Sequence, residues 1–370
     1  MPDATSSNPH RPNPRRLTAA AAILEATAQC MQADPAVYLM GEGVADPKGI
    51  FGTTLGLVER FGPARVIEMP VAENGLTGIA IGSALMGQRP VMVHQRVDFA
   101  LLAVEQLLNN AAKTHFVTNG VHKVPLTVRM IIGRGWGQGP EHSQVFDSVF
   151  AHAPGLKVVL PSTPYEAKGM MVAAIRDDNP VIILEHRWMH YAEGEVPEEL
   201  YQTPLIGPNR VREGGDVTIV ASSFALFEAM EAVDHMAAAG VACDLFDLRV
   251  VRPLDLTDII ASVRRTGRLI IIDTGWKMFG VGAEIASQVT EACFSQLKAA
   301  PRRLGLPDQP TPSSRGLASN FYPNPQILAE TVAALIPEAA PKLAPAIGAL
   351  EALRTRVPVD VPNPAFRGPF

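Results

Sequence analysis

Residues 155–185 read GLKVVLPSTPYEAKGMMVAAIRDDNPVIILE, and this stretch decides the fold. An apolar run over 156–160 predicts a buried strand, and a second run over 180–185 predicts another. Between them, Thr163-Pro164-Tyr165-Glu166 is typical of a helix start, because it combines a capping box with proline at the first helical position. A strand, a helix and a second strand in this order predict two parallel strands joined by a crossover helix.

The chain before this unit continues the same alternation of strands and helices. Short apolar runs over 66–69, 91–93 and 124–132 predict further strands. Apolar residues packed tightly over 75–86, or spaced three and four apart over 99–112, predict two helices. Strands separated by helices are typical of a parallel sheet that helices cover on both faces.

A second α/β unit follows a polar, proline-containing stretch. Residues 192–213 (AEGEVPEELYQTPLIGPNRVRE) predict a linker, and the alternation of strands and helices restarts over 214–336. The ends of the chain, 1–16 and the Ala/Pro-rich 337–370, predict tails outside the folded domains. The predicted fold class is therefore α/β with two parallel-sheet domains, the first over 17–191.

Composition excludes several classes of protein. The 370 residues are 47% hydrophobic and 19% charged, which is too apolar for a disordered chain. The net charge is −5, so no basic surplus exists to bind nucleic acid. Cys30, Cys243 and Cys293 lie too far apart in sequence to suggest a disulfide framework or a closed zinc site. No apolar run approaches the ~18–20 residues that cross a bilayer, and no secretory signal is present, so we expect a cytoplasmic protein that binds no membrane.

Polar segments follow three of the predicted strands, where parallel sheets bind ligands. Glu73 lies between the strand over 66–69 and the start of an apolar helix. Residues 94–98 (HQRVD) follow the next strand, and 133–144 (GRGWGQGPEHSQ) follow the third, with His142 near the end. Because the carboxyl ends of parallel strands meet at one edge of a sheet, we expect these segments to form one site.

Each of these signals also has an ordinary structural explanation. A first-turn glutamate such as Glu73 is favoured by the helix dipole alone. A lone histidine such as His142 is more often structural than catalytic. The glycines of 133–144 do not match the dinucleotide fingerprint G-x-G-x-x-G, so we interpret them as residues that let the backbone approach a ligand and present His142.

Several longer segments resemble one family. They are PVAENGLTGIAIGSALMG (70–87), EQLLNNAAKT (105–114), EHSQ (141–144), HAPGLKVVLPSTPYEAKGM (152–170) and AIRDDNPVIILE (174–185). In this order they are similar to the beta subunit of the thiamin-diphosphate-dependent 2-oxo acid dehydrogenases, the first components of the pyruvate, branched-chain and acetoin complexes. The resemblance runs from Leu17 to Ile336. It implies a transketolase-like pyrimidine-binding domain followed by a transketolase C-terminal-like domain.

The resemblance implies thiamin diphosphate as the cofactor and a role for several residues. Glu73 corresponds to the catalytic glutamate that hydrogen-bonds the cofactor's aminopyrimidine ring, and Phe99 to the aromatic residue that packs against this ring. His142 corresponds to a catalytic histidine near the reacting carbon. A structural K+ site built mainly from backbone oxygens is implied at four residues: Leu126, Ala174, Asp177 and Asn179. A helix end and a turn would explain the last of these positions without any ion.

One family motif is missing from the chain. In the family, Gly-Asp-Gly followed further on by asparagine holds the diphosphate through Mg2+, and Gly215-Asp216-Val217 is no substitute. The resemblance therefore implies an alpha subunit that supplies this half of the site, in an α2β2 heterotetramer. It also implies docking to a lipoyl acyltransferase. The glycine-bearing helix over 76–87 suits close packing, either across the subunit interface or within the domain.

The segment 94–98 departs from the family, many of whose members carry an acidic, aromatic-rich stretch here. His94 and Arg96 are candidates to bind a substrate carboxylate or hydroxyl group, and solvent-exposed or subunit-facing positions would explain them equally well. The loop 133–144 contributes three more candidates for the substrate site: Arg134, Trp136 and Glu141. Trp136 also suits an interface.

The sequence thus predicts a beta subunit that, with its alpha partner, decarboxylates a 2-oxo acid and transfers the acyl group to a lipoyl carrier. A split transketolase-like or carboligase subunit with the same cofactor is an alternative. A catalytically silent regulatory subunit is an alternative of another class, and the presence of Glu73, Phe99 and His142 together argues against it.

Overall fold

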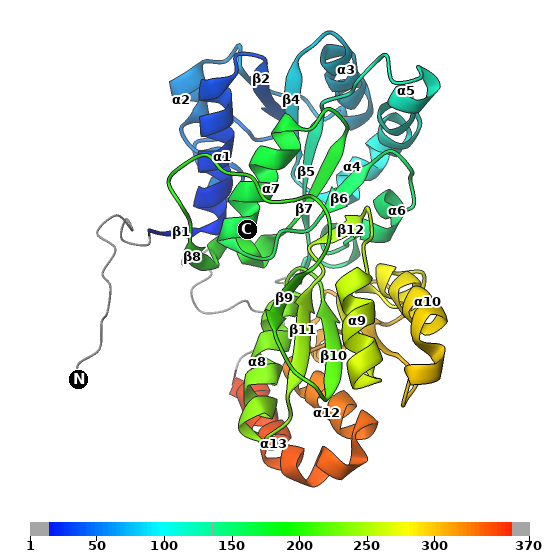
Figure 1. Ribbon diagram of the computed structural model, residues 1–370. Coiled ribbons are helices and arrows are strands. Elements are labelled where there is room, and N and C mark those ends of the chain that lie inside the picture. Colours follow the sequence, from blue (N-terminus) through cyan, green and yellow to red (C-terminus); the bar gives the residue numbers. More distant parts are fainter. Residues whose placement is uncertain (1–14, 135–136, 357–370) are drawn as a thin grey trace, which may run out of the picture.

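The computed structural model describes residues 15–134 and 137–356, which form two α/β domains (Figure 1). The first domain contains a sheet of seven strands in the order β12-β6-β7-β5-β4-β2-β3. Its neighbouring strands are parallel except for the pair of β12 and β6. The strands are β2 (Val37–Gly41), β3 (Val66–Glu68), β4 (Arg89–His94), β5 (Thr127–Ile132), β6 (Lys157–Val159), β7 (Val181–His186) and β12 (Val250–Arg252).

Helices cover both faces of this sheet, as the alternation of strands and helices predicts. On one face, residues of α1 (Ala19–Ala33) and α7 (Pro164–Arg176) share a buried cluster with Val91 of β4. On the other face, residues of α3 (Glu73–Leu85) share a cluster with Met92. Successive residues of a strand point to opposite faces, so β4 contributes to both clusters.

The chain from Val97 onward is helical, but in several short pieces rather than in the single helix that we predicted. These pieces are α4 (Val97–Ala100), the 3-10 turn η2 (Leu101–Ala103), the π-helical η3 (Gln106–Ala111) and α5 (Ala112–Val117). The change of helix type along this segment agrees with the spacing of its buried residues. They recur every three positions at first and every four positions later: Val97, Ala100, Ala103, Leu107 and Ala111. Phe99 therefore lies in the first short turn, directly after β4.

Helix α7 begins where its sequence predicts, with the proline and the threonine cap in place, but the Glu166 side chain of the predicted capping box turns elsewhere. Thr163 Oγ1 accepts a hydrogen bond from the N–H of Glu166 at 3.1 Å. The Glu166 carboxylate points to the second half of the chain, where it accepts from Arg249 Nη1 at 2.6 Å and from Asn209 Nδ2 at 2.9 Å. The glutamate of the predicted capping box therefore ties the two domains together.

The second domain has a five-stranded sheet in the order β14-β13-β10-β11-β9, in which only β9 runs antiparallel to its neighbour. The strands are β9 (Asn209–Arg212), β10 (Val217–Ala221), β11 (Cys243–Asp247), β13 (Leu269–Trp276) and β14 (Arg302–Leu306). The main helices are α8 (Ala225–Ala238), α9 (Thr257–Thr266), α10 (Val281–Cys293) and α12 (Pro325–Leu335). These strands and helices confirm the prediction of a second α/β unit.

Two predicted non-domain segments contain regular structure. In the predicted linker, β8 (Glu193–Glu195) pairs with β1 (Arg16–Thr18), and β9 joins the second sheet. In the predicted C-terminal tail, the turn η7 (Pro337–Ala339) leads into α13 (Ala340–Arg356), which packs on α8 and α12 (Figure 1). Three buried side chains form an apolar stripe on α13: Leu343, Ala346 and Leu350. The high alanine and proline content of the segment led us to predict a tail instead.

One strand crosses from the second unit to the first sheet. β12 lies within the residues that we assigned to the second domain, but it pairs with β6 at the edge of the first sheet. The N–H of Leu160 continues this contact by donating to the Arg249 carbonyl at 2.8 Å. Across the described residues, no helix combines the length and apolarity that a membrane span requires.

Candidate functional site

The three polar segments meet at the carboxyl edge of the first sheet. Strands β5, β4, β2 and β3 are consecutive neighbours, so the segments that follow them lie side by side. Glu73 is the first residue of α3 and is only 3% exposed, although it is a charged residue type. A carboxyl held away from water at a helix start is unusual.

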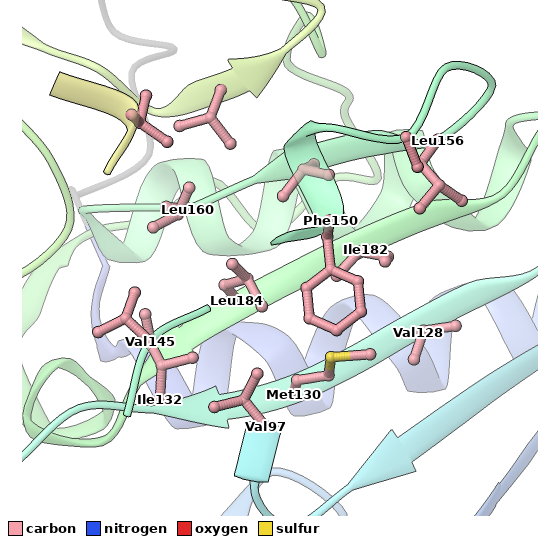
Figure 2. Packing of buried hydrophobic residues seen from close by; sticks show 14 of the residues in the cluster. Val97, Val128, Met130, Ile132, Val145, Phe150, Leu156, Leu160, Ile182 and Leu184 are labelled. Carbon is pink, nitrogen blue, oxygen red and sulfur yellow. The ribbon is translucent and has the colours of Figure 1, made fainter. Parts of the chain in front are cut away.

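Phe99 and His142 come from two of these segments and touch each other. Their ring centroids lie 5.4 Å apart, with the rings perpendicular, and both side chains are half-buried. Gln144 Nε2 donates to Asp98 Oδ1 at 2.6 Å and ties the two segments together. The core fixes both backbones, since Val97 and Val145 share one buried cluster with the strand residues of β5 (Figure 2).

A second carboxyl accompanies Glu73. Glu42 follows β2 at the same edge of the sheet and is half-buried. Burial and the neighbouring Glu73 carboxyl raise the pKa of Glu42. The sequence analysis missed Glu42, although its position directly after a strand of the parallel sheet was the signal that pointed to Glu73.

The two candidate substrate ligands in segment 94–98, His94 and Arg96, have different surroundings in the structure. His94 is 1% exposed, its Nε2 lies 3.4 Å from Thr77 Oγ1, and burial lowers its pKa to about 4. A neutral, enclosed imidazole is not favoured as a carboxylate ligand. Arg96, in contrast, lines a cavity and reaches the histidine loop, with Nη1 donating to the His142 carbonyl at 3.4 Å.

The loop between β5 and His142 packs against the second domain. The Arg134 guanidinium lies 4.6 Å from the Trp188 ring centroid and 4.2 Å from that of Tyr322, and Nη2 donates to Glu228 Oε1 at 2.8 Å. This position favours a contact between domains over the predicted contact with substrate. Glu141 is exposed, and Trp136 lies outside the described residues.

Two glycines of this loop, Gly137 and Gly139, serve a contact within the chain. Gly137 and Gly139 have φ angles of +68° and +71°, and a Cβ on either would approach Ser313 to 2.7 Å or less. Glycine is required here by both the left-handed backbone and the close approach. We predicted that these glycines admit a ligand, whereas the structure shows that they admit a segment of the second domain.

Comparison with known families agrees with this architecture. Residues 15–190 match the family model described as transketolase, pyrimidine binding domain, and residues 208–327 match transketolase, C-terminal domain. The pyruvate dehydrogenase E1 component subunit beta of Rickettsia felis is 38% identical over 317 residues, which cover 86% of this chain and 97% of that protein. The chain belongs to the beta subunits of the thiamin-diphosphate-dependent 2-oxo acid dehydrogenases.

Other relatives in this beta-subunit family have different names. The acetoin:2,6-dichlorophenolindophenol oxidoreductase subunit beta of Cupriavidus necator is 37% identical, over 84% of this chain and 94% of that protein. The mitochondrial pyruvate dehydrogenase E1 component subunit beta of Bos taurus is 36% identical, over 85% and 89%. A solved structure titled split gene transketolase, inactive beta4 tetramer, shares the fold with a TM-score of 0.66 at 20% identity, covering 91% of this chain and 99% of that one.

The site fits the pyrimidine half of thiamin diphosphate, the cofactor that the family implies. An aminopyrimidine ring needs a carboxyl that it can share a proton with and an apolar face to pack on. The enclosed Glu73 carboxyl and the half-buried Phe99 ring offer these two groups at one edge of the sheet. Within the described ranges, no group of three or more His, Cys, Asp or Glu side chains is placed to hold a metal ion.

The four residues of the implied K+ site lie close together in this beta subunit. The carbonyl of Leu126 accepts from the N–H of Val181 at 2.9 Å, and the carbonyl of Ala174 accepts from the N–H of Asp177 at 3.2 Å. Asp177 Oδ1 in turn accepts from the N–H of Asn179 at 2.9 Å. The bond to Leu126 continues the pairing of β5 with β7, and the other two are those of a helix end and a turn.

Two cationic side chains also reach Asp177. Lys157 forms an ion pair with its carboxylate, and Arg89 Nη1 donates to its carbonyl at 3.0 Å. The structure thus brings the four residues together, and the ion itself stays a prediction.

Proposed function

We propose that this chain and an alpha subunit together decarboxylate a 2-oxo acid and transfer the acyl group to a lipoyl carrier. One observation carries the proposal: the Glu73 carboxyl is enclosed at the start of α3, at the same sheet edge as the Phe99 and His142 rings, which are in contact. A subunit without catalytic function would have no need to maintain a buried carboxyl at this place, since burial of such a group costs free energy.

Each of the three residues has a defined task in this proposal. Glu73 hydrogen-bonds a ring nitrogen of the cofactor and exchanges a proton with it in a place that excludes water. Phe99 provides the apolar surface that orients the ring, and His142 delivers or removes a proton at the reacting carbon. When bound, thiamin diphosphate supplies the nucleophilic carbon and the electron sink for decarboxylation.

We propose that the alpha subunit holds the diphosphate and Mg2+ and that the assembly is an α2β2 heterotetramer. A set of exposed apolar side chains, in α3, η2 and α5 and shortly after α3 and α5, supports this contact, with exposed fractions from 61% at Ile79 to 86% at Phe116. Its members are Ile79, Met86, Leu102, Phe116, Val117 and Val121. At Gly82, on the same helix, a Cβ would meet no described atom within 4 Å, so this glycine serves no packing within the domain.

The experiment is co-expression with a candidate alpha subunit, followed by assay of a panel of 2-oxo acids. An artificial electron acceptor reports decarboxylation, and a lipoyl domain reports acyl transfer. We expect both activities, together with their loss in the Glu73→Gln variant. Product formed only with an aldehyde acceptor would identify a carboligase instead, and failure of the assembled pair to bind thiamin diphosphate would identify a silent subunit.

Two further proposals concern the surroundings of the protein. We propose that K+ binds at Leu126, Ala174, Asp177 and Asn179, which predicts a higher melting temperature in KCl than in choline chloride of the same ionic strength. We also propose a cytoplasmic location, which fractionation of the source cells would test.

A further inference from the structure

A cavity of about 300 Å3 adjoins the candidate site. It lies between the loop after β2 and the end of β4, and its volume is at the lower end of the range for small-molecule sites. Its walls are formed by Gly43, Asp46, Lys48, Gly49, Ile50, Phe51, Gln95 and Arg96. Arg96 connects the cavity to the site, because the same guanidinium contacts the His142 carbonyl.

The Arg96 guanidinium of this cavity donates its hydrogen bonds to neutral acceptors. Arg96 is 8% exposed and donates to the His142 carbonyl and to Gln138 Oε1, the latter at 3.0 Å from Nη2, and the Asp98 carboxyl is its neighbouring opposite charge. Lys48, an exposed residue of the loop after β2, also lines the cavity. The single acidic residue of the wall, Asp46, accepts the N–H of Lys48 at 2.7 Å within its own turn. The lining therefore has a positive charge excess.

A second guanidinium lies behind the wall. Arg187 is fully buried, donates to the same Gln138 oxygen and lies 5.5 Å from the centroid of the Phe51 ring. Two guanidinium groups thus converge on one uncharged amide oxygen. A carboxylate in the cavity within reach of Arg96 would form charge-assisted hydrogen bonds, which are about twice as strong as those to a neutral acceptor.

We propose that this cavity binds a carboxylate at the far end of the substrate's side chain, so that the substrate is a dicarboxylic 2-oxo acid. The inference deepens the proposed function and rests on it. The carboxylate next to the reacting carbon is a poor occupant, because its charge disappears as carbon dioxide forms. Cations bound to it would stabilise the substrate more than the transition state, whereas a distal carboxylate keeps its charge throughout.

The test compares substrates of equal chain length on the assembled enzyme. We expect kcat/KM for 2-oxopentanedioate to exceed that for 2-oxopentanoate by about 10-fold or more, because a charge-assisted hydrogen bond is gained. The same ratio is expected for 2-oxohexanedioate over 2-oxohexanoate. Glutarate should compete with the substrate, and pentanoate should not.

Two variants assign this preference to the cavity. Arg96→Met and Lys48→Met should each lower the ratio of dicarboxylate to monocarboxylate kcat/KM, mainly through KM. Arg96→Met also removes the contact with the His142 loop, whereas Lys48 belongs to the loop after β2, so a lowered ratio in both variants reports the cavity rather than the His142 loop. Lys277→Met, an exposed change in the second domain, is the matched control and should leave the ratio unchanged.

The outcomes separate this inference from the proposed function. Turnover of monocarboxylic 2-oxo acids with a ratio at or below one, or a ratio that neither variant changes, would overturn the dicarboxylate site and leave the decarboxylase proposal intact. Turnover of no 2-oxo acid would remove both.

Discussion

Arg134 of the first domain and Glu228 of the second form an ion pair of 2.8 Å within a group of aromatic rings. Only 10% of the arginine side chain and 13% of the glutamate side chain are exposed. Since Arg134 begins the loop that ends in His142, the pair holds the histidine loop against α8. The relative position of the two domains and the geometry of the site are therefore coupled.

Removing one partner of this pair leaves the other charge buried. We expect Arg134→Met or Glu228→Leu alone to lower the free energy of unfolding by about 3–5 kcal/mol, and the double variant to lower it by less than the sum. Urea denaturation of the four proteins measures this coupling. The exposed pair of Arg212 and Asp234 is the control, with an expected coupling below about 1 kcal/mol. If the stability losses of the two single variants add up in the double variant, the two side chains do not stabilise each other. This result would contradict the role of the Arg134–Glu228 pair in holding the histidine loop.

Asp247 predicts how stability depends on pH. Burial raises its pKa to about 7, with Ser162 Oγ donating to its carboxyl at 2.7 Å. Because the folded pKa is higher than the unfolded value, the favourable contribution is full at low pH and is lost as pH rises toward 7. We expect the wild type to lose about 2–3 kcal/mol relative to Asp247→Asn between pH 5 and pH 8.

The measurement is the free energy of unfolding of both proteins across this pH range. The exposed Asp308→Asn variant serves as the control and should run parallel to the wild type. A constant difference between wild type and Asp247→Asn would show that the Asp247 carboxyl is already ionised at pH 5.

Leu343 tests the contribution of α13 to the second domain. Its side chain is fully buried in a cluster with residues of α8 and α12, so Leu343→Ala should cost about 2–5 kcal/mol of stability. Leu353→Ala, at a position on the same helix that is 40% exposed, should cost less than about 1 kcal/mol. If chemical denaturation showed equally small stability losses for both variants, α13 would not contribute to the folded domain, as the prediction of a tail implies.

Ile79 tests the proposed contact with the alpha subunit. It is 61% exposed on α3, so Ile79→Glu should leave the circular dichroism spectrum and the melting temperature of the isolated chain unchanged. A carboxylate buried without a partner in the interface should weaken association at least about tenfold. Ile206→Glu, at an apolar position that is 51% exposed elsewhere, is the control for the co-purification assay. Normal association of Ile79→Glu would place the interface elsewhere.

Much of the architecture could be predicted because local patterns and tertiary structure agree. The strands around 155–185 and the cap at Thr163 follow from hydrophobic runs and helix-start chemistry that need no distant partner. The same reasoning selected Glu73 and His142 as candidates, since both follow strands of a parallel sheet, and their roles stay predictions. The family and its cofactor then came from longer motifs whose order is specific.

The missed features depend on contacts between distant residues. β12 belongs to the first sheet only because it meets β6, about ninety positions earlier in the chain. Arg134 looked like a substrate ligand until Trp188, Tyr322 and Glu228 were seen around it. No pattern in the local sequence distinguishes an arginine that meets a ligand from one that meets the other domain.

The most direct test of the account is the Glu73→Gln variant, assembled with the alpha subunit and compared with Glu59→Gln, an exposed change on the nearby helix of residues 57–61. The measurement is kcat for decarboxylation, with the melting temperature as a check on folding. We predict that Glu73→Gln lowers kcat by about 10^2- to 10^4-fold with an unchanged melting temperature, because a proton-transfer group is lost. Retention of most of the activity by a folded Glu73→Gln enzyme would contradict the role of this carboxyl and the site built around it.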